Sequence, residues 1–156
     1  MTEGPASQEI ELRRATDSDA AAIAYVYLAA FKATYDFPLA HTDDETRAWV
    51  AGYLVPRTET WVADEADRIV AMMAIEDGSI DQLYVVPDSQ GRGIGSRLVE
   101  LAKTRRPEGL ELYTFQVNER ARRFYEHHGF LVALLGDGSG NEEGQPDVLY
   151  RWRPER

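Results

Sequence analysis

The fold of this protein is decided by residues 83–98, which read LYVVPDSQGRGIGSRL. The apolar run Leu83–Val86 is typical of a buried strand, and Pro87 ends it because proline has no amide to donate to a neighbouring strand. A glycine-rich loop follows, and apolar residues then recur at helical spacing from Ile94 to Thr104. The stretch therefore predicts a strand, a loop and a helix in direct succession.

The loop, QGRGIGS at residues 90–96, has the properties of a phosphate cradle. Glycines allow backbone amides to approach phosphate oxygens, and the positive end of the following helix dipole favours an anion there. Arg92 can add a charge-assisted contact. A dinucleotide fingerprint fits less well because position 96 is serine instead of glycine or alanine, and a P-loop is absent. An ordinary strand-to-helix turn is the structural alternative.

Strands and helices can be assigned outward from this loop. We expect a meander of strands over 61–63, 69–75 and 80–86, with Asp77-Gly78 as a hairpin turn. It is preceded by a strand over 9–14, a helix capped by Thr16 or Asp17, and a helix that starts at Thr42 or Asp43 and stops at Pro56. After the loop and its helix come a strand over 110–117, a helix over 119–128 ending at Gly129, and strands over 130–135 and 148–152. This order predicts an α/β (α+β) fold with a mixed sheet and helices on both faces.

Length and composition restrict the class of protein. The 156 residues suit one domain, which we place at residues 9–156 after a flexible N-terminus at residues 1–8. The chain has no cysteine and no apolar run near the ~20 residues of a membrane span. The net charge of −10 argues against general nucleic-acid binding. We therefore expect a cytoplasmic protein with no membrane or nucleic-acid partner, and the isolated His41 gives no metal-ligand spacing.

Charge is distributed unevenly along the chain. Residues 91–123 contain eight basic and four acidic side chains, so this segment carries +4 and the remainder −14. Two solvated helix faces would account for this, and so would a local anion site in an acidic protein.

Two motifs resemble those of the GNAT N-acetyltransferases. Residues 90–95 match the acetyl-CoA loop of that family, Q/R-x-x-G-x-G/A, and residues 118–130, NERARRFYEHHGF, match its second motif, N-x-x-A-x-x-F/L-Y-x-x-x-G-F. Their order and separation are those of the family. The resemblance implies a mostly antiparallel central sheet whose fourth and fifth strands splay apart, with acetyl-CoA as cosubstrate and no metal.

The resemblance also implies where the cofactor lies. The pantetheine arm would pair with the strand backbone, and an amide near Tyr84 or Val85 would face the thioester oxygen as in an oxyanion hole. Asn118 would bond the arm, although it also sits where a helix N-cap belongs. The expected cofactor-binding residues are Leu83, Tyr84, Val85, Gln90, Gly91, Arg92, Gly93, Ile94, Gly95, Ser96, Asn118 and Phe124.

Three side chains are candidates for proton transfer. Tyr125 of the second motif would donate a proton to the departing sulfur; the alternative for Tyr125 is packing on an amphipathic helix. An ammonium acceptor must first lose a proton, and Asp81 and Glu76, near the Asp77-Gly78 hairpin, are the candidate bases, with Asp81 favoured. Relatives that acetylate protein N-termini carry glutamate five residues before the motif asparagine; Tyr113 stands there, which argues against that substrate.

The acceptor side is expected from residues 34–44 and 136–146, with Tyr35, Asp36 and His41 as substrate-binding candidates. Acidic walls suit a cationic acceptor, and a solvated acidic surface is the alternative. We predict acetyl transfer to a primary amine of a small molecule or peptide by direct attack in a ternary complex. A catalytically silent acyl-CoA-binding module is the main rival, and transfer to a hydroxyl or of a longer acyl chain is a third option. The resemblance leaves a homodimer open.

Overall fold

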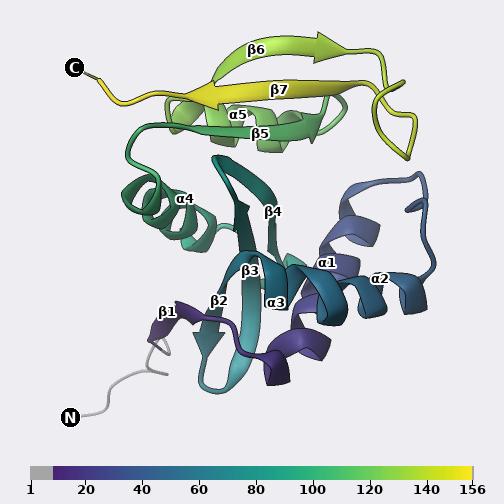
Figure 1. Ribbon diagram of the computed structural model, residues 1–156, viewed down its shortest axis with the longest axis vertical. Coiled ribbons are helices and arrows are strands. Elements are labelled where there is room, and N and C mark those ends of the chain that lie inside the picture. The colour runs from purple at the N-terminus through teal and green to yellow at the C-terminus, as the bar shows by residue number, and fades with distance from the viewer. Residues whose placement is uncertain (1–8, 156) are drawn as a thin grey trace.

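The computed structural model describes residues 9–155 and contains one seven-stranded sheet with helices around it (Figure 1). Residues 1–8, for which a flexible terminus is predicted, lie outside the described part. The elements are β1 (Ile10–Arg14), a short 3-10 helix (Asp17–Asp19), α1 (Ala20–Thr34), α2 (Asp43–Trp49), a π-helical turn (Val50–Leu54), α3 (Val55–Arg57), β2 (Glu59–Glu65), β3 (Arg68–Glu76), β4 (Ser79–Val85), a second 3-10 helix (Pro87–Ser89), α4 (Ile94–Arg105), β5 (Leu110–Phe115), α5 (Glu119–His127), β6 (Leu131–Gly136) and β7 (Asp147–Trp152).

The predicted order of elements is confirmed, and helix caps explain where several of them begin. Thr42 accepts a hydrogen bond from the amide of Glu45, whose side chain bonds back to the Thr42 amide, so a capping box starts α2. Asn118 caps α5, and Gly129 follows that helix with a left-handed φ of 86°. The 3-10 helix at 17–19 separates the predicted Thr16 cap from α1.

One boundary prediction is wrong. Pro56 does not end the helical segment that starts at Asp43; it lies inside α3, after the π-helical turn. In this wide turn the Val55 amide donates to the carbonyl of Val50. Pro56 then occupies the first turn of α3, where a missing amide costs no hydrogen bond.

Strand order across the sheet is β1-β2-β3-β4-β5-β7-β6, and every neighbouring pair except β4–β5 is antiparallel. The parallel pair is joined at a single position, Ser79 opposite Glu111, supported by a 2.9 Å bond from the Glu111 amide to the carbonyl of Gly78. Beyond that position the two strands diverge. The predicted splay of the fourth and fifth strands is therefore confirmed.

The core sits on both faces of the central strands. Residues Val70–Ile75 of β3 are buried without alternation, which is the pattern of a strand covered on both sides. Both α1 and α4 contact β3 and β4, as predicted for helices on both faces.

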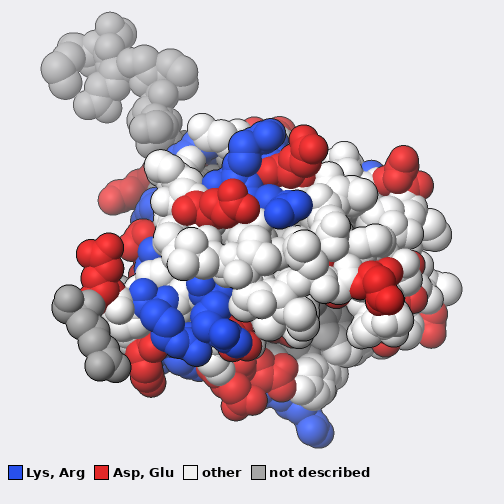
Figure 2. Space-filling model, turned by 90° about the horizontal axis from the view of Figure 1, so that it is seen from above, with Lys and Arg blue, Asp and Glu red and all other residues white. Residues whose placement is uncertain are grey.

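At the far end of the sheet, β6 is an edge strand with apolar side chains exposed, among them Leu131 and Leu134. The face seen from above is accordingly uncharged over much of its centre (Figure 2). In the described part of the chain, no helix combines the length and apolar character needed to span a membrane.

Candidate active site

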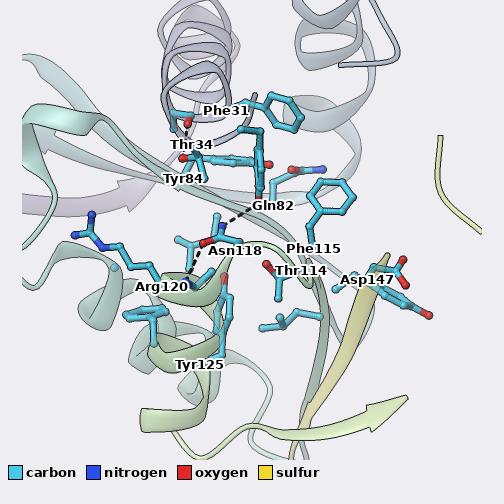
Figure 3. A pocket seen from close by; sticks show the side chains of 18 of the residues that line it. Phe31, Thr34, Gln82, Tyr84, Thr114, Phe115, Asn118, Arg120, Tyr125 and Asp147 are labelled. Carbon is cyan, nitrogen blue, oxygen red and sulfur yellow. Dashed lines mark hydrogen bonds between the residues drawn. The ribbon is translucent and has the colours of Figure 1, made fainter. Parts of the chain in front are cut away.

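The splayed strands open a cleft of about 1380 Å³, the central cleft. Its walls come from the end of α1, from β4, from the glycine-rich loop and start of α4, from β5, from α5 and from the 136–147 loop. Segments that are far apart in sequence thus meet where β4 and β5 lose their pairing. Figure 3 shows this cleft with the side chains that converge on it.

The glycine-rich loop presents a row of free amides to this cleft. Among the hydrogen bonds of residues 9–155, none uses an amide from Gly91 to Ser96 as donor; the first helical bond runs from the Arg97 amide to the carbonyl of Gly93, at 3.1 Å. Gly91 and Gly93 have φ values of 82° and 81°, a left-handed region that favours glycine. Successive free amides at the start of a twelve-residue helix form a site that suits the oxygens of a diphosphate.

Gly95 serves a different purpose, because it lets α5 approach α4. A Cβ at this position would lie 3.3 Å from Cζ of Phe124. The Phe124 ring therefore closes against the helix start and forms part of the cleft wall beside the free amides.

Arginine contacts at the loop differ from the prediction. Arg92 does not line the cleft: its guanidinium forms a two-point ion pair with Glu65, which also raises the pKa of Arg92. Two other cations, Arg120 and Arg123 on α5, line the cleft instead, and Arg120 donates to Oε1 of Gln90 at 2.8 Å. The basic segment at 91–123 contained these residues, but only the packing of α5 beside the loop turns them toward it.

The unpaired edge of β4 offers backbone groups to the cleft. The Val86 amide donates to the carbonyl of Val70 on β3, at 2.9 Å, so by strand alternation Val85 directs its amide and carbonyl toward the opposite, open edge. The Val85 carbonyl accepts a 3.0 Å bond from Nε2 of Gln90. Of the two amides predicted to face a thioester, Val85 therefore has the favourable direction and Tyr84 does not. The side chains of Leu83 and Tyr84 line the same wall.

Asn118 joins two walls of the cleft. Its Oδ1 accepts from the amide of Ala121 at 3.0 Å, which is the predicted N-cap, and its Nδ2 donates to the Tyr35 hydroxyl at 2.8 Å. Tyr35 in turn packs against Phe115 of β5, with ring centroids 5.2 Å apart. The pKa of Tyr35 is raised, mainly by burial.

Tyr125 reaches the cleft from α5. Its ring is buried, with 8% of its surface exposed, and its hydroxyl points up toward Asn118 and Thr114 in Figure 3. No hydrogen bond within the described chain uses this hydroxyl. Burial raises the pKa of Tyr125 well above its ordinary value, so the phenol is neutral and holds its proton at physiological pH.

The two candidate bases occupy different surroundings. Asp81 lies on the cleft wall, and its pKa is raised, first by burial and also by the negative charge of Glu76. Glu76 is not among the residues that line the cleft; its Oε1 accepts a 2.6 Å bond from the Tyr53 hydroxyl. The structure therefore brings Asp81, and not Glu76, to the open edge of β4.

Of the three acceptor-side candidates, only Tyr35 lines the cleft. Asp36 is exposed and lies outside it. His41 bonds Glu142 through Nε2 at 2.5 Å, and the neighbouring Ala40 amide donates to Glu143 at 3.0 Å. These two contacts join the segment after α1 to the 136–146 loop, and of this cluster Glu143 faces the cleft.

Charge in the cleft is divided between its two ends. Arg120 and Arg123 accompany the free amides, as does Glu119, whose carboxylate lies 4.0 Å from Arg123, whereas Asp81, Asp137, Glu143 and Asp147 stand on other walls. Figure 3 has Arg120 and Asp147 at opposite sides. An anion is favoured at the first end and a cation at the second. Residues 9–155 contain no group of three or more side chains that could hold a metal ion.

Comparison with known proteins agrees with this geometry. Residues 56–132 match the family described as acetyltransferase (GNAT) domain. The peptidyl-lysine N-acetyltransferase YjaB of Escherichia coli is 32% identical over 141 residues, which cover 90% of this chain and 93% of that protein.

Solved structures share the fold. The solution structure of apo YjaB from Escherichia coli superposes with a TM-score of 0.77 at 28% identity and covers 92% of this chain and 97% of its own. The acetyltransferase yncA of Salmonella typhimurium, solved with acetyl-CoA, has a TM-score of 0.70 at 20% identity and covers 95% of both chains. This chain therefore belongs to the GNAT acetyltransferase family and is an N-acetyltransferase that uses acetyl-CoA as its cosubstrate.

Proposed function

We propose that this enzyme acetylates the ε-amino group of lysine side chains in peptides or proteins. The observation that carries the proposal is the divided charge of the central cleft. Free amides, two arginines and one glutamate lie at one end, and the charged side chains on the other walls are all carboxylates. A lysine side chain carries a compact ammonium on a long, thin stem, so the cation can enter toward Asp81 and Glu143. The relative YjaB of Escherichia coli, a peptidyl-lysine N-acetyltransferase by name, supports the same substrate class.

In this proposal the backbone from Gly91 to Ser96 holds the diphosphate of acetyl-CoA, and Arg120 and Arg123 balance its charge. The arm would then follow the open edge of β4, where the Val85 amide is aimed at the developing oxyanion. Leu83, Tyr84, Phe124 and Asn118 form the walls that position it. Each of these groups faces the cleft, which supports the assignment.

Tyr125 would protonate the departing thiolate. Its neutral phenol lies in the cleft without another partner, which supports this role. We expect Tyr125→Phe to lower kcat by about 10 to 1000-fold with little change in CoA binding. Tyr150→Phe is the matched control, because Tyr150 is also buried and contacts the Tyr125 ring, but its hydroxyl donates to Glu126 at 2.6 Å. A loss of turnover in Tyr84→Phe instead of Tyr125→Phe would reassign the proton donor.

Asp81 would receive the ammonium proton, directly or through water. We expect Asp81→Asn to lower kcat and to recover part of it at alkaline pH, where more of the free amine is present without help. Glu76→Gln serves as the comparison, since Glu76 lies outside the cleft. If Glu76→Gln gave the larger loss and Asp81→Asn none, the base would be misassigned.

The deciding experiment is an acceptor panel followed by release of free thiol from acetyl-CoA and by mass spectrometry. A peptide with a blocked N-terminus and one lysine should be acetylated. The same peptide with norleucine in place of lysine should not, nor should a lysine-free peptide with a free N-terminus. Acetylation of only the last peptide would refute the proposal. A cytoplasmic location, expected from the sequence, and a homodimer, which the resemblance leaves open, are tested by fractionation and sedimentation.

A further inference from the structure

A row of three hydrogen-bonded polar side chains adjoins the glycine-rich loop, and none of these side chains has a role in the proposal above. Ser96, in the first turn of α4, places its Oγ 2.9 Å from Nε2 of His128, which follows the end of α5. The other ring nitrogen of His128, Nδ1, lies 3.2 Å from Oε1 of Glu100. Serine, imidazole and carboxylate are thus connected in sequence, with the serine in the cleft wall among the free amides.

The imidazole is held firmly in this arrangement. The His128 side chain is 10% exposed, and its ring lies against Phe124 with centroids 4.8 Å apart. Lys103 donates from Nζ to the His128 carbonyl at 2.6 Å. A side chain fixed on both nitrogens and on one ring face is positioned to control the direction of the Ser96 hydroxyl.

We propose that His128 is a positioning residue whose protonation is coupled to binding of the CoA diphosphate through Ser96. The inference rests on the proposed function, because it requires the diphosphate to lie on the Gly91–Ser96 amides. The direction in which protonation changes diphosphate binding follows from which of the two ring nitrogens carries a proton.

When His128 is neutral, the carboxylate of Glu100 favours the tautomer with the proton on Nδ1. Nε2 is then an acceptor, and the Ser96 hydroxyl donates to it, so only lone pairs of Oγ face an incoming anion. When His128 is protonated, Nε2–H donates to Oγ, and the Ser96 hydroxyl proton is released to donate to a phosphate oxygen. The protonated imidazolium also adds a positive charge next to the anion. Diphosphate binding therefore favours the protonated form and takes up as much as one proton.

Charged groups of both signs lie near His128. Glu100 on α4 is the carboxylate partner, and Lys103 lies 3.6 Å from that same carboxylate. The ring centroid of His127 lies 5.5 Å from that of His128. Glu155 lines a shallow surface hollow together with both histidines. Of these, His127 is the other histidine. It is exposed and, among the described residues, forms no hydrogen bond with Ser96, so it provides an internal control.

The test measures the affinity of the purified full chain for dephospho-CoA between pH 6 and pH 8.5. Dephospho-CoA keeps the diphosphate but lacks the 3′-phosphate, a monoester whose second proton dissociates near pH 6 and would obscure the linkage. We expect the Kd to rise about tenfold across this range, a change of about 1.4 kcal/mol in the free energy of binding. Calorimetry in buffers of different ionisation enthalpy should show proton uptake on binding near neutral pH.

Three variants separate the proposal from a structural role. His128→Gln can still bond Ser96 but cannot titrate, so its Kd should be nearly independent of pH and its proton uptake absent. Glu100→Gln, at an exposed position, should move the rise in Kd to lower pH, because the imidazolium loses its carboxylate. His127→Gln should behave like the wild type.

The outcomes are distinct. A wild-type Kd that is flat with pH, an unchanged pH dependence in His128→Gln, or an equal loss in His127→Gln would overturn the coupling and leave the proposed cofactor site standing. An absence of dephospho-CoA and CoA binding at every pH would instead remove the site assignment and the coupling together.

Discussion

Replacement of Asn118 tests how the two walls of the central cleft are held together. The Asn118 side chain makes two bonds, accepting from the Ala121 amide at 3.0 Å and donating to the Tyr35 hydroxyl at 2.8 Å. Loss of an N-cap costs about 0.5–2 kcal/mol and loss of one further hydrogen bond about 0.5–1.5 kcal/mol. We therefore expect Asn118→Ala to lower the free energy of unfolding by ~2 kcal/mol.

Asn118→Asp and Tyr35→Phe resolve the two contributions. An aspartate can still cap the helix, its charge suits the N-terminal end of the helix dipole, and it can accept a bond from the Tyr35 hydroxyl. Its cost should be below about 1 kcal/mol. Tyr35→Phe removes only the bond across the cleft and should cost about 1 kcal/mol.

The assay is urea unfolding followed by circular dichroism without acetyl-CoA, together with thermal unfolding. A loss of ~2 kcal/mol corresponds to a fall in Tm of about 4–8 °C for a chain of this size. If Asn118→Asp were as unstable as Asn118→Ala, the cap would not be the source of the stability. If the double variant Asn118→Ala with Tyr35→Phe showed the full sum of the single losses, the bond between the two residues would contribute nothing.

Three further predictions follow from other contacts. Gly93→Ala places a side chain at a left-handed φ of 81° with no atom within 4 Å, so backbone strain alone should cost about 1–2 kcal/mol in urea unfolding, and Gly93→Asn should cost less because asparagine tolerates this conformation. Arg120→Ala should raise the Kd for CoA about tenfold, as expected for a lost charge-assisted contact of ~1.4 kcal/mol. Arg92→Ala, the control, should leave the Kd within about twofold. If calorimetry gave the larger loss for Arg92→Ala, Arg120 would not be the cation that faces the cofactor. The pKa of Asp19 is lowered to about 2, first by its hydrogen bonds from Arg13. The stability that Asp19 contributes is therefore fully present above its unfolded pKa of 3.8 and is lost as the pH falls through about 4 to 2. Asp19→Asn should remove this part of the acid transition, and an unchanged acid unfolding curve would refute the prediction.

Local chemistry in the sequence predicted most of the secondary structure. Periodicity, caps and turn residues act between neighbours in the chain, so the glycine-rich loop, the Thr42 cap and the Gly129 helix end could be identified without a fold. The prediction that Pro56 ends the helix was wrong because it considered the proline without the turn before it. Whether proline ends a helix depends on the hydrogen bonds of the preceding turn, and the π-helical turn there leaves no signal in residue type.

The predicted cofactor-site residues that line the cleft are mostly those for which backbone or a local motif supplies the group, and their roles remain a proposal. Tyr125 and the loop residues Gly91 and Gly93–Ser96 line the central cleft, whereas Arg92 does not. The positions of long polar side chains could not be predicted, because their direction depends on partners distant in sequence. Arg92 forms an ion pair with Glu65, Glu76 accepts a hydrogen bond from Tyr53, and His41 bonds Glu142. The serine–histidine–glutamate chain was missed for the same reason, since Ser96 and His128 lie 32 positions apart.

The sequence by itself determined that this protein has a strand, an amide-rich loop and a helix able to receive a phosphate, because those properties depend on glycine, proline and apolar spacing within a few residues. Tertiary structure alone decided which side chains share the cleft with that loop. The reason is physical: β4 and β5 pair at one position and then diverge, and the direction of each charged side chain around the opening is set by partners that folding brings from elsewhere in the chain.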